Sequence, residues 1–180
     1  MKEFMRRGGW VFLGLIIVGS ALAGGIYSVI AGGSNSSTNN YINCPTKSVT
    51  TQKPGSNGKY QGAKLVNFTP VKHIDYLQCQ DLKVGTGSTA TATSTITATY
   101  TGALANSGVI FQSSLDTGQP FTAQLGSGVI QGWTAGLPGM KVGGTRRLLI
   151  PAQYAYGAQS VAGIPPNSDL VFDITLLAVK

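Results

Sequence analysis

The stretch LGSGVIQGWTAGLPGMKVGG, residues 125–144, decides the fold, because it carries a tryptophan into one short turn of helix and then stops that helix. Ile130, Trp133 and Leu137 stand at positions i, i+3 and i+7, so they share one face of a helix. The Pro-Gly pair that follows is typical of a helix end. The segment therefore predicts one short helix with a single apolar face.

A phosphate-binding loop is the rival interpretation of the same glycines, because bare N–H groups at a helix start bind anions. The dinucleotide fingerprint needs G-x-G-x-x-G after a buried strand. Here Gly126, Gly128 and Gly132 are spaced G-x-G-x-x-x-G and are followed by a tryptophan. With one histidine, His73, and no C-x-x-C pair, a metal site is also disfavoured, so we expect no cofactor and interpret His73 as a surface residue.

Short strand-like runs surround this helix. In TSTITATYTGAL, residues 93–104, Ile96, Ala98 and Tyr100 alternate with threonines, which is the period of a half-buried strand. DLVFDITLLAV (169–179) has the same pattern, and GTRRLLIP (144–151), VIFQSS (109–114) and DLKVGTG (81–87) supply three further candidate strands. The predicted fold class is α+β, an antiparallel half-wrapped β-sheet around one short α-helix, over residues 63–180.

The N-terminal third predicts export. Residues 1–9 are basic, and residues 10–31, WVFLGLIIVGSALAGGIYSVIA, are uncharged and long enough to span a bilayer as a helix. The basic flank would hold the N-terminus in the cytoplasm and put the rest outside, as a single-pass membrane protein. The alternative is a signal peptide cleaved near Ala23, after which the chain would be secreted.

Residues 32–62 are rich in Gly, Ser, Thr and Asn, the composition of a flexible linker between anchor and domain. Cys44 lies in this linker and Cys79 at the edge of the domain. Export permits a disulfide between them, and two free thiols are the alternative. The formal net charge of +7 is spread along the chain without a dense basic patch after Arg7, so we expect no nucleic-acid partner.

Five segments together resemble the FKBP-type peptidyl-prolyl cis-trans isomerases. They are YTGAL, VIFQSSLDTGQPF, LGSGVIQGWTAGLPGMKVGGTRRLLIP, AYGAQ and IPPNSDLVFDITLL, in the family's order and spacing. The resemblance covers roughly residues 78–180. The lead-in from residue 63 looks like the extension found in bacterial members, so the chain resembles an exported, membrane-anchored bacterial member of the family.

The resemblance implies a prolyl pocket and a role for each residue in it. Trp133 would be the floor under the pyrrolidine ring, and the Ile130 N–H and the Tyr156 hydroxyl would bind substrate carbonyls. The full set of implied catalytic residues is Tyr100, Phe111, Ile130, Trp133, Tyr156 and Phe172, and the implied substrate-binding residues are Gln112, Phe121, Val129 and Ile164.

Two departures from the family pattern accompany these roles. Members usually have an aspartate directly after the phenylalanine that matches Phe111, and this chain has Gln112, which can keep a hydrogen bond but not the charge. The loop SVAGIPP, residues 160–166, also looks one residue short.

The resemblance further implies macrolide inhibitors of the pocket, proline-containing unfolded or flexible polypeptides as substrates, and a monomer. The alternative function is a catalytically weak binding module or holdase for proline peptides.

Overall fold

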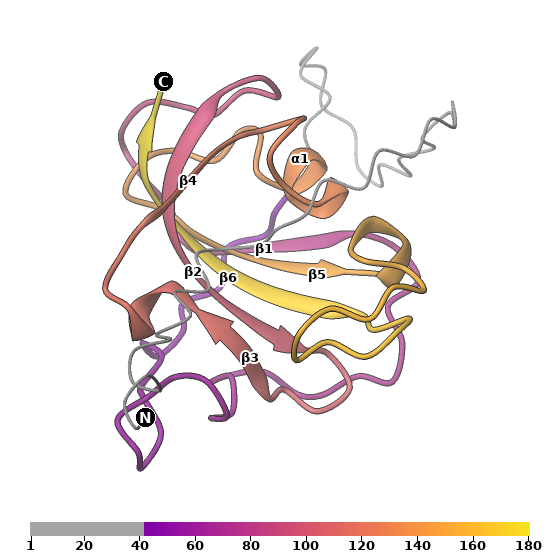
Figure 1. Ribbon diagram of the computed structural model, residues 1–180. Coiled ribbons are helices and arrows are strands. Elements are labelled where there is room, and N and C mark those ends of the chain that lie inside the picture. The colour runs from indigo at the N-terminus through magenta and orange to yellow at the C-terminus, as the bar shows by residue number, and fades with distance from the viewer. Residues whose placement is uncertain (1–41) are drawn as a thin grey trace, which may run out of the picture.

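The computed structural model describes residues 42–180 as one antiparallel sheet wrapped around a short helix (Figure 1). The strands are β1 (Gln78–Lys83), β2 (Thr95–Leu104), β3 (Ile110–Ser113), β4 (Phe121–Gln124), β5 (Thr145–Ile150) and β6 (Leu170–Val179), with the helix α1 (Gln131–Gly136). Two 3-10 turns, η1 (Ser114–Asp116) and η2 (Ala152–Tyr154), complete the elements. The strand order is β1-β5-β6-β2-β3, and β4 also pairs with β2. The predicted sheet with one helix is confirmed.

The period-2 patterns place the core as predicted. Along β2, Ile96, Ala98 and Tyr100 are buried and the threonines between them are half-buried. β6 lies in the middle of the sheet, between β5 and β2. The predicted row of Leu170, Phe172, Ile174 and Leu176 on β6 is fully buried. These rows form the concave face against which α1 packs (Figure 1).

Two glycines let α1 lie close to the sheet. A Cβ at Gly132 would come 2.5 Å from the Ile150 side chain, and one at Gly136 would come 2.7 Å from Leu148. Any other residue at either position would push the helix away from β5, although glycine disfavours the helix itself. Ile130, Trp133 and Leu137, which share the predicted apolar face, are all buried.

The strand predictions were wrong at two places. The first strand begins at Gln78, before the predicted start at Asp81, and ends at Lys83, where the chain turns through the glycines that close the predicted run. Gly85 approaches the backbone of residues 141–144 too closely for any side chain. β4 was not predicted at all, because it is only four residues long, although its half-buried and exposed positions do alternate.

The prediction of a flexible linker over residues 32–62 does not describe residues 42–62, which follow the surface of the domain. The Lys47 N–H donates to the Asp81 carbonyl at 2.9 Å, and the Asp81 N–H donates to the Pro45 carbonyl at 3.0 Å. This short segment thereby covers β1, which would otherwise expose unpaired backbone groups at the sheet edge. Backbone pairing of this kind needs no apolar side chains, so the composition of the segment did not reveal it.

Cys44 and Cys79 form a disulfide, which decides between the two states that the sequence left open. Cys79 lies on β1 and is buried, and the bond fixes residues 42–47 beside that strand.

Further along, residues 63–74 pack on the second face of the sheet. There Leu65 and Ile74 form a smaller core with Ile110 and Val171. The lead-in to the predicted domain is therefore part of its packing.

Reduction of the disulfide is expected to lower the free energy of unfolding by about 2–4 kcal/mol, because the bond closes a long loop in the unfolded chain. The two cysteines are 35 residues apart. Urea unfolding with and without reductant measures the difference. The Cys44→Ser variant should unfold like the reduced wild type and should not respond to reductant. A wild-type midpoint that reductant leaves unchanged would contradict the prediction.

Residues 1–41 lie outside the described part of the chain. The predicted basic segment (1–9), the predicted transmembrane anchor (10–31) and the first part of the predicted linker (32–41) all fall there. Within residues 42–180, the structure contains no helix of the length and hydropathy that a membrane span requires.

Candidate active site

Aromatic rings from three strands converge on Trp133 of α1. The indole lies 5.6 Å from the Tyr100 ring of β2, 5.5 Å from the Phe172 ring of β6 and 6.0 Å from the Phe121 ring of β4, in each case edge to face. Edge-to-face pairs at these distances are favourable beyond the area that they bury. Because α1 lies over the concave face of the sheet, its one tryptophan meets rings from three strands.

Gly102 makes room for the opposite wall. A Cβ at this position of β2 would lie 2.6 Å from the Phe111 ring and 2.6 Å from the Phe172 ring. The two rings therefore pack over a bare patch of sheet, 5.7 Å apart and edge to face. A glycine in a strand interior, here Gly102, is the sequence signal for such a close approach.

The structure brings nine of the ten predicted site residues into one cluster. Buried there are Tyr100, Phe111, Val129, Ile130, Trp133, Ile164 and Phe172, and partly buried at its margin are Phe121 and Tyr156. Gln112 lies on β3, paired with Gly102 of β2, and is partly buried. Within residues 42–180 its side chain makes no hydrogen bond, so the amide does not replace the contact expected of an aspartate. The catalytic role of each residue stays a prediction.

Three polar groups in this cluster have no partner among the described residues. The Trp133 Nε1–H is buried and makes no hydrogen bond, and a group left so costs about 1–3 kcal/mol. The Ile130 N–H and the Tyr156 hydroxyl also find no acceptor or donor within residues 42–180. The two donors that the resemblance assigns to substrate carbonyls are thus unused.

The backbone of Tyr100 is fixed by two serines that no sequence pattern indicated. The Tyr100 N–H donates to Ser114 Oγ at 2.9 Å, and the Ser113 hydroxyl donates to the Tyr100 carbonyl at 3.1 Å. Both hydroxyls are buried. They immediately follow Phe111 and Gln112 in the chain, so these two hydroxyls set the position of Tyr100 on β2.

The tyrosines of the cluster stay protonated far above neutral pH. Burial, with a smaller contribution from Tyr156, raises the pKa of Tyr100 to about 12. Burial also raises the pKa of Tyr156 above its ordinary value. Both hydroxyls therefore remain neutral and able to donate a hydrogen bond at physiological pH.

A loss of stability in alkali follows from the Tyr100 shift. Between pH 10 and 12 the unfolded chain releases the Tyr100 proton while the folded chain keeps it, so the free energy of unfolding falls as pH rises through that range. The contribution is fully present below pH 10. Urea unfolding of wild type and Tyr100→Phe from pH 8 to pH 11.5 measures it. A decline equally steep in both proteins would show that other groups cause it.

The loop at residues 160–166 closes on itself and brings its isoleucine to the cluster. The Ile164 N–H donates to the Val161 carbonyl at 2.7 Å, and the Val161 N–H donates to the Ile164 carbonyl at 3.2 Å. Ile164 is buried against the aromatic rings and Val161 is partly buried beside them. The shorter loop therefore still presents its isoleucine to the cluster.

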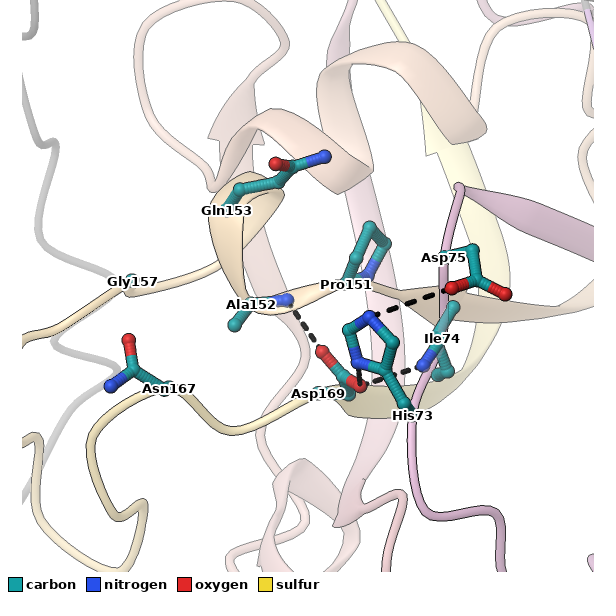
Figure 2. A pocket seen from close by; sticks show the side chains of 9 residues that line it. All are labelled: His73, Ile74, Asp75, Pro151, Ala152, Gln153, Gly157, Asn167 and Asp169. Atoms are coloured by element: carbon teal, nitrogen blue, oxygen red, sulfur yellow. Dashed lines mark hydrogen bonds and ion pairs between the residues drawn. The ribbon is translucent and has the colours of Figure 1, made fainter.

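A surface hollow of about 340 Å³ is lined in part by Ala152, Gln153 and Gly157, and none of the clustered aromatic residues lines it (Figure 2). His73 is at its edge, 69% exposed, as a surface histidine should be. The sequence did not reveal that His73 Nδ1 lies 2.8 Å from Asp169 Oδ2 or that His73 Nε2 lies 3.6 Å from Asp75. The hollow is therefore a polar feature separate from the aromatic cluster.

Comparisons with known proteins agree on the nature of this domain. Residues 86–177 match the family model described as FKBP-type peptidyl-prolyl cis-trans isomerase. The chain is 47% identical over 121 residues to FK506-binding protein 4 of Neurospora crassa, covering 65% of this chain and 26% of that protein. This chain thus spans about a quarter of the length of that fungal relative.

Two solved structures are similar over the same region. FkpA from Escherichia coli is 40% identical with a TM-score of 0.54, over 65% of this chain and 53% of that one. AtFKBP13 is 37% identical with a TM-score of 0.53, over 60% of this chain and 96% of that one. Because relatives include fungal and bacterial proteins, the comparisons do not support the bacterial origin that the sequence suggested, nor a membrane anchor.

Proposed function

Because the chain belongs to the FKBP-type peptidyl-prolyl cis-trans isomerases, we propose that its domain catalyses rotation about X-Pro bonds by removing water from the amide and stabilising its twisted form. The observation that carries this is the aromatic cluster. It holds Trp133 among three other rings, with the unpartnered Ile130 N–H and Tyr156 hydroxyl beside them. No nucleophile or metal is required for a reaction that makes and breaks no covalent bond.

The barrier explains why an apolar site suits this reaction. Resonance gives the peptide C–N bond partial double-bond character and a rotational barrier of about 18–20 kcal/mol, so uncatalysed X-Pro isomerisation takes tens to hundreds of seconds. The planar amide is more charge-separated than the twisted one and is better solvated by water. Aromatic walls that strip this water away favour the transition state over the bound substrate.

Fixed donors add to this effect. The Ile130 N–H lies at the N-cap of α1, where no residue of the described chain accepts from it. The Tyr156 hydroxyl stays protonated because burial raises its pKa. Donors that are already oriented need no reorganisation when charge shifts onto a carbonyl oxygen during rotation.

The substrates that we propose are X-Pro bonds in unfolded or flexible polypeptides outside the cytoplasm. The support lies in the sequence, where the uncharged residues 10–31 follow a basic segment. A Cys44–Cys79 disulfide is also typical of an oxidising compartment. Secretion after cleavage near Ala23 is the alternative location, and fractionation of the full-length chain with an alkaline wash of the membranes separates the two.

The decisive experiment is the cis-to-trans rate of a Leu-Pro or Phe-Pro test peptide with the full-length chain, with and without the macrolide FK506. We expect acceleration that FK506 abolishes. An FK506-resistant rate would mean that another site is responsible, and no acceleration at any enzyme concentration would reject the proposed function.

A second candidate function is a binding module or holdase that keeps the pocket and lacks useful turnover. Gln112 favours it, because its side chain carries no charge and makes no hydrogen bond within residues 42–180. The Gln112→Asp variant tests this candidate, with the isomerisation rate and FK506 affinity as readouts. A large gain in turnover without a change in affinity would show that Gln112 limits catalysis. An unchanged rate would remove the reason for preferring a binding module.

A further inference from the structure

The carboxylate of Asp169 binds groups from two segments that are distant from each other in the sequence, residues 73–74 and Ala152 (Figure 2). Its Oδ1 accepts from the Ala152 N–H at 2.8 Å, and its Oδ2 accepts from the Ile74 N–H at 2.7 Å and lies 2.8 Å from His73 Nδ1. The side chain is only 8% exposed. Asp169 lies directly before β6. The carboxylate that contacts the Ala152 N–H, the Ile74 N–H and the His73 ring is therefore held at the start of a central strand.

Ala152 is the residue that organises the loop carrying Tyr156. Its N–H donates to Asp169, and its carbonyl accepts from the Ala155 N–H at 3.0 Å and the Gly157 N–H at 2.9 Å. Tyr156 lies between these last two residues. Asp169 thus holds the peptide unit before Ala152, and the peptide unit after Ala152 holds the backbone on both sides of Tyr156.

We propose that Asp169 is a positioning residue for Tyr156 and that, through Ala152, it holds the Tyr156 hydroxyl where a substrate carbonyl can reach it. This inference rests on the proposed function. The lead-in to the domain then also contributes to the active site, because the Ile74 N–H donates to the same carboxylate and His73 lies beside it. Residues 73–74 therefore stabilise the arrangement of a loop that begins 78 residues later, at Ala152.

A carboxylate suits this position because it is an acceptor only, with room for several donors. An amide of the same shape would place its own NH₂ against one of the groups that now donate. Removing the carboxylate would leave the Ala152 N–H, a half-buried backbone donor, without its acceptor. The loop would then be free to adopt other positions, and small displacements of a catalytic group are costly.

A double-mutant cycle between Asp169→Ala and Tyr156→Phe tests the proposal. In the wild-type background Asp169→Ala should lower kcat/KM about tenfold, mainly through kcat. In the Tyr156→Phe background the same change should cost less than about twofold, because the group that it positions has lost its hydroxyl. Equal losses in both backgrounds would overturn the proposal. Asp169→Asn should be intermediate, since its amide oxygen can still accept from Ala152.

Asp116→Ala is the matched control. Asp116 also accepts from two backbone N–H groups, those of Tyr60 and Gln61. It therefore joins the N-terminal segment, residues 42–62, to the domain without contacting the loop of Tyr156. We expect its kcat/KM to stay within about twofold of wild type. A loss equal to that of Asp169→Ala would show that loosening the N-terminal segment, and not the loop, causes the effect.

A readout that does not depend on turnover separates failure of this inference from failure of the proposed function. Amide hydrogen exchange at Ala152 and the NMR shifts of the Tyr156 ring should change in Asp169→Ala and not in Asp116→Ala. If they change while the wild type shows no isomerisation, the proposed function fails and the positioning of Tyr156 stands. If they do not change, the positioning role fails whatever the activity.

Discussion

Replacing Trp133 by alanine is expected to abolish measurable isomerisation and FK506 binding. The indole is fully buried and packs against three other aromatic rings, so its removal takes away the support of the aromatic cluster that would receive a proline ring. A pyrrolidine that buries about 100 Å² there gains roughly 2.5 kcal/mol. That free energy corresponds to about 70-fold in kcat/KM, before any disorder of the surrounding rings is counted.

The same variant should lower the free energy of unfolding by about 3–5 kcal/mol, so loss of stability has to be separated from loss of the site. Leu137→Ala is the matched control, because Leu137 is fully buried on the same face of α1. Truncating it should cost about 2–5 kcal/mol and leave the rings around Trp133 in place. Urea unfolding, isomerisation and FK506 titration are measured on both. An equal loss of activity in Leu137→Ala would contradict a specific role for Trp133.

The Trp133→Phe variant distinguishes the contribution of the aromatic ring from that of the indole N–H group. The buried Nε1–H makes no hydrogen bond in the described part of the chain, which is unfavourable for stability. Sequences tend to keep unfavourable features where function requires them. A phenylalanine keeps an aromatic floor and removes the unsatisfied donor, so this variant should lose less stability than truncation predicts while still losing part of its affinity for FK506.

The parts of the fold that sequence predicted are those encoded by neighbours along the chain. The alternation in β2 and β6 and the i, i+3, i+7 spacing of Ile130, Trp133 and Leu137 depend on local period alone, and burial follows it residue by residue. The aromatic members of the site were found because strand alternation and the family resemblance select the same positions. Their meeting in one cluster then follows from the pairing of β2 with β6.

The interactions that sequence did not predict are polar and join residues far apart. Arg146 occupies the same row of β5 as Leu148 and Ile150, where alternation alone predicts an apolar residue. It is tolerated there because Asp81, 65 residues earlier, supplies a carboxylate. Asp169 likewise receives Ile74 from 95 residues away. No local sequence pattern predicts such pairs. The one sequence feature that indicates them is a charged residue, such as Arg146, in an otherwise apolar row of a strand.

The largest effect outside the aromatic cluster is expected from Arg146→Met. Arg146 is buried, its Nε donates to Asp81 at 2.7 Å, and its Nη1 donates to the carbonyls of Gly136 at 2.9 Å and Pro138 at 3.3 Å. It therefore holds the C-terminal end of α1 against β5. Its loss should lower the free energy of unfolding by about 3–5 kcal/mol, because Asp81 then keeps a partly buried charge without a partner.

The activity of Arg146→Met should fall about tenfold, since α1 carries Trp133 and small displacements of a site are costly. Arg147→Met is the matched control from the next position of β5. Arg147 pairs with Asp173 at 2.7 Å and donates to the carbonyls of residues 66 and 67, so its loss should destabilise the fold to a similar extent without touching α1.

A milder substitution, Arg146→Lys, tests the effect of Arg146 on the site with a smaller loss of stability. Arg146→Lys keeps a positive charge beside Asp81, but a single ammonium group cannot reproduce the forked contacts that a guanidinium makes with the carboxylate and the helix end together. We expect it to recover most of the stability lost in Arg146→Met and only part of the FK506 affinity. If FK506 affinity followed stability alone across Arg146→Met, Arg146→Lys and Arg147→Met, then Arg146 would be a structural residue with no specific effect on Trp133. An affinity that falls only in the two Arg146 variants would instead show that the anchoring of α1 sets the geometry of the site.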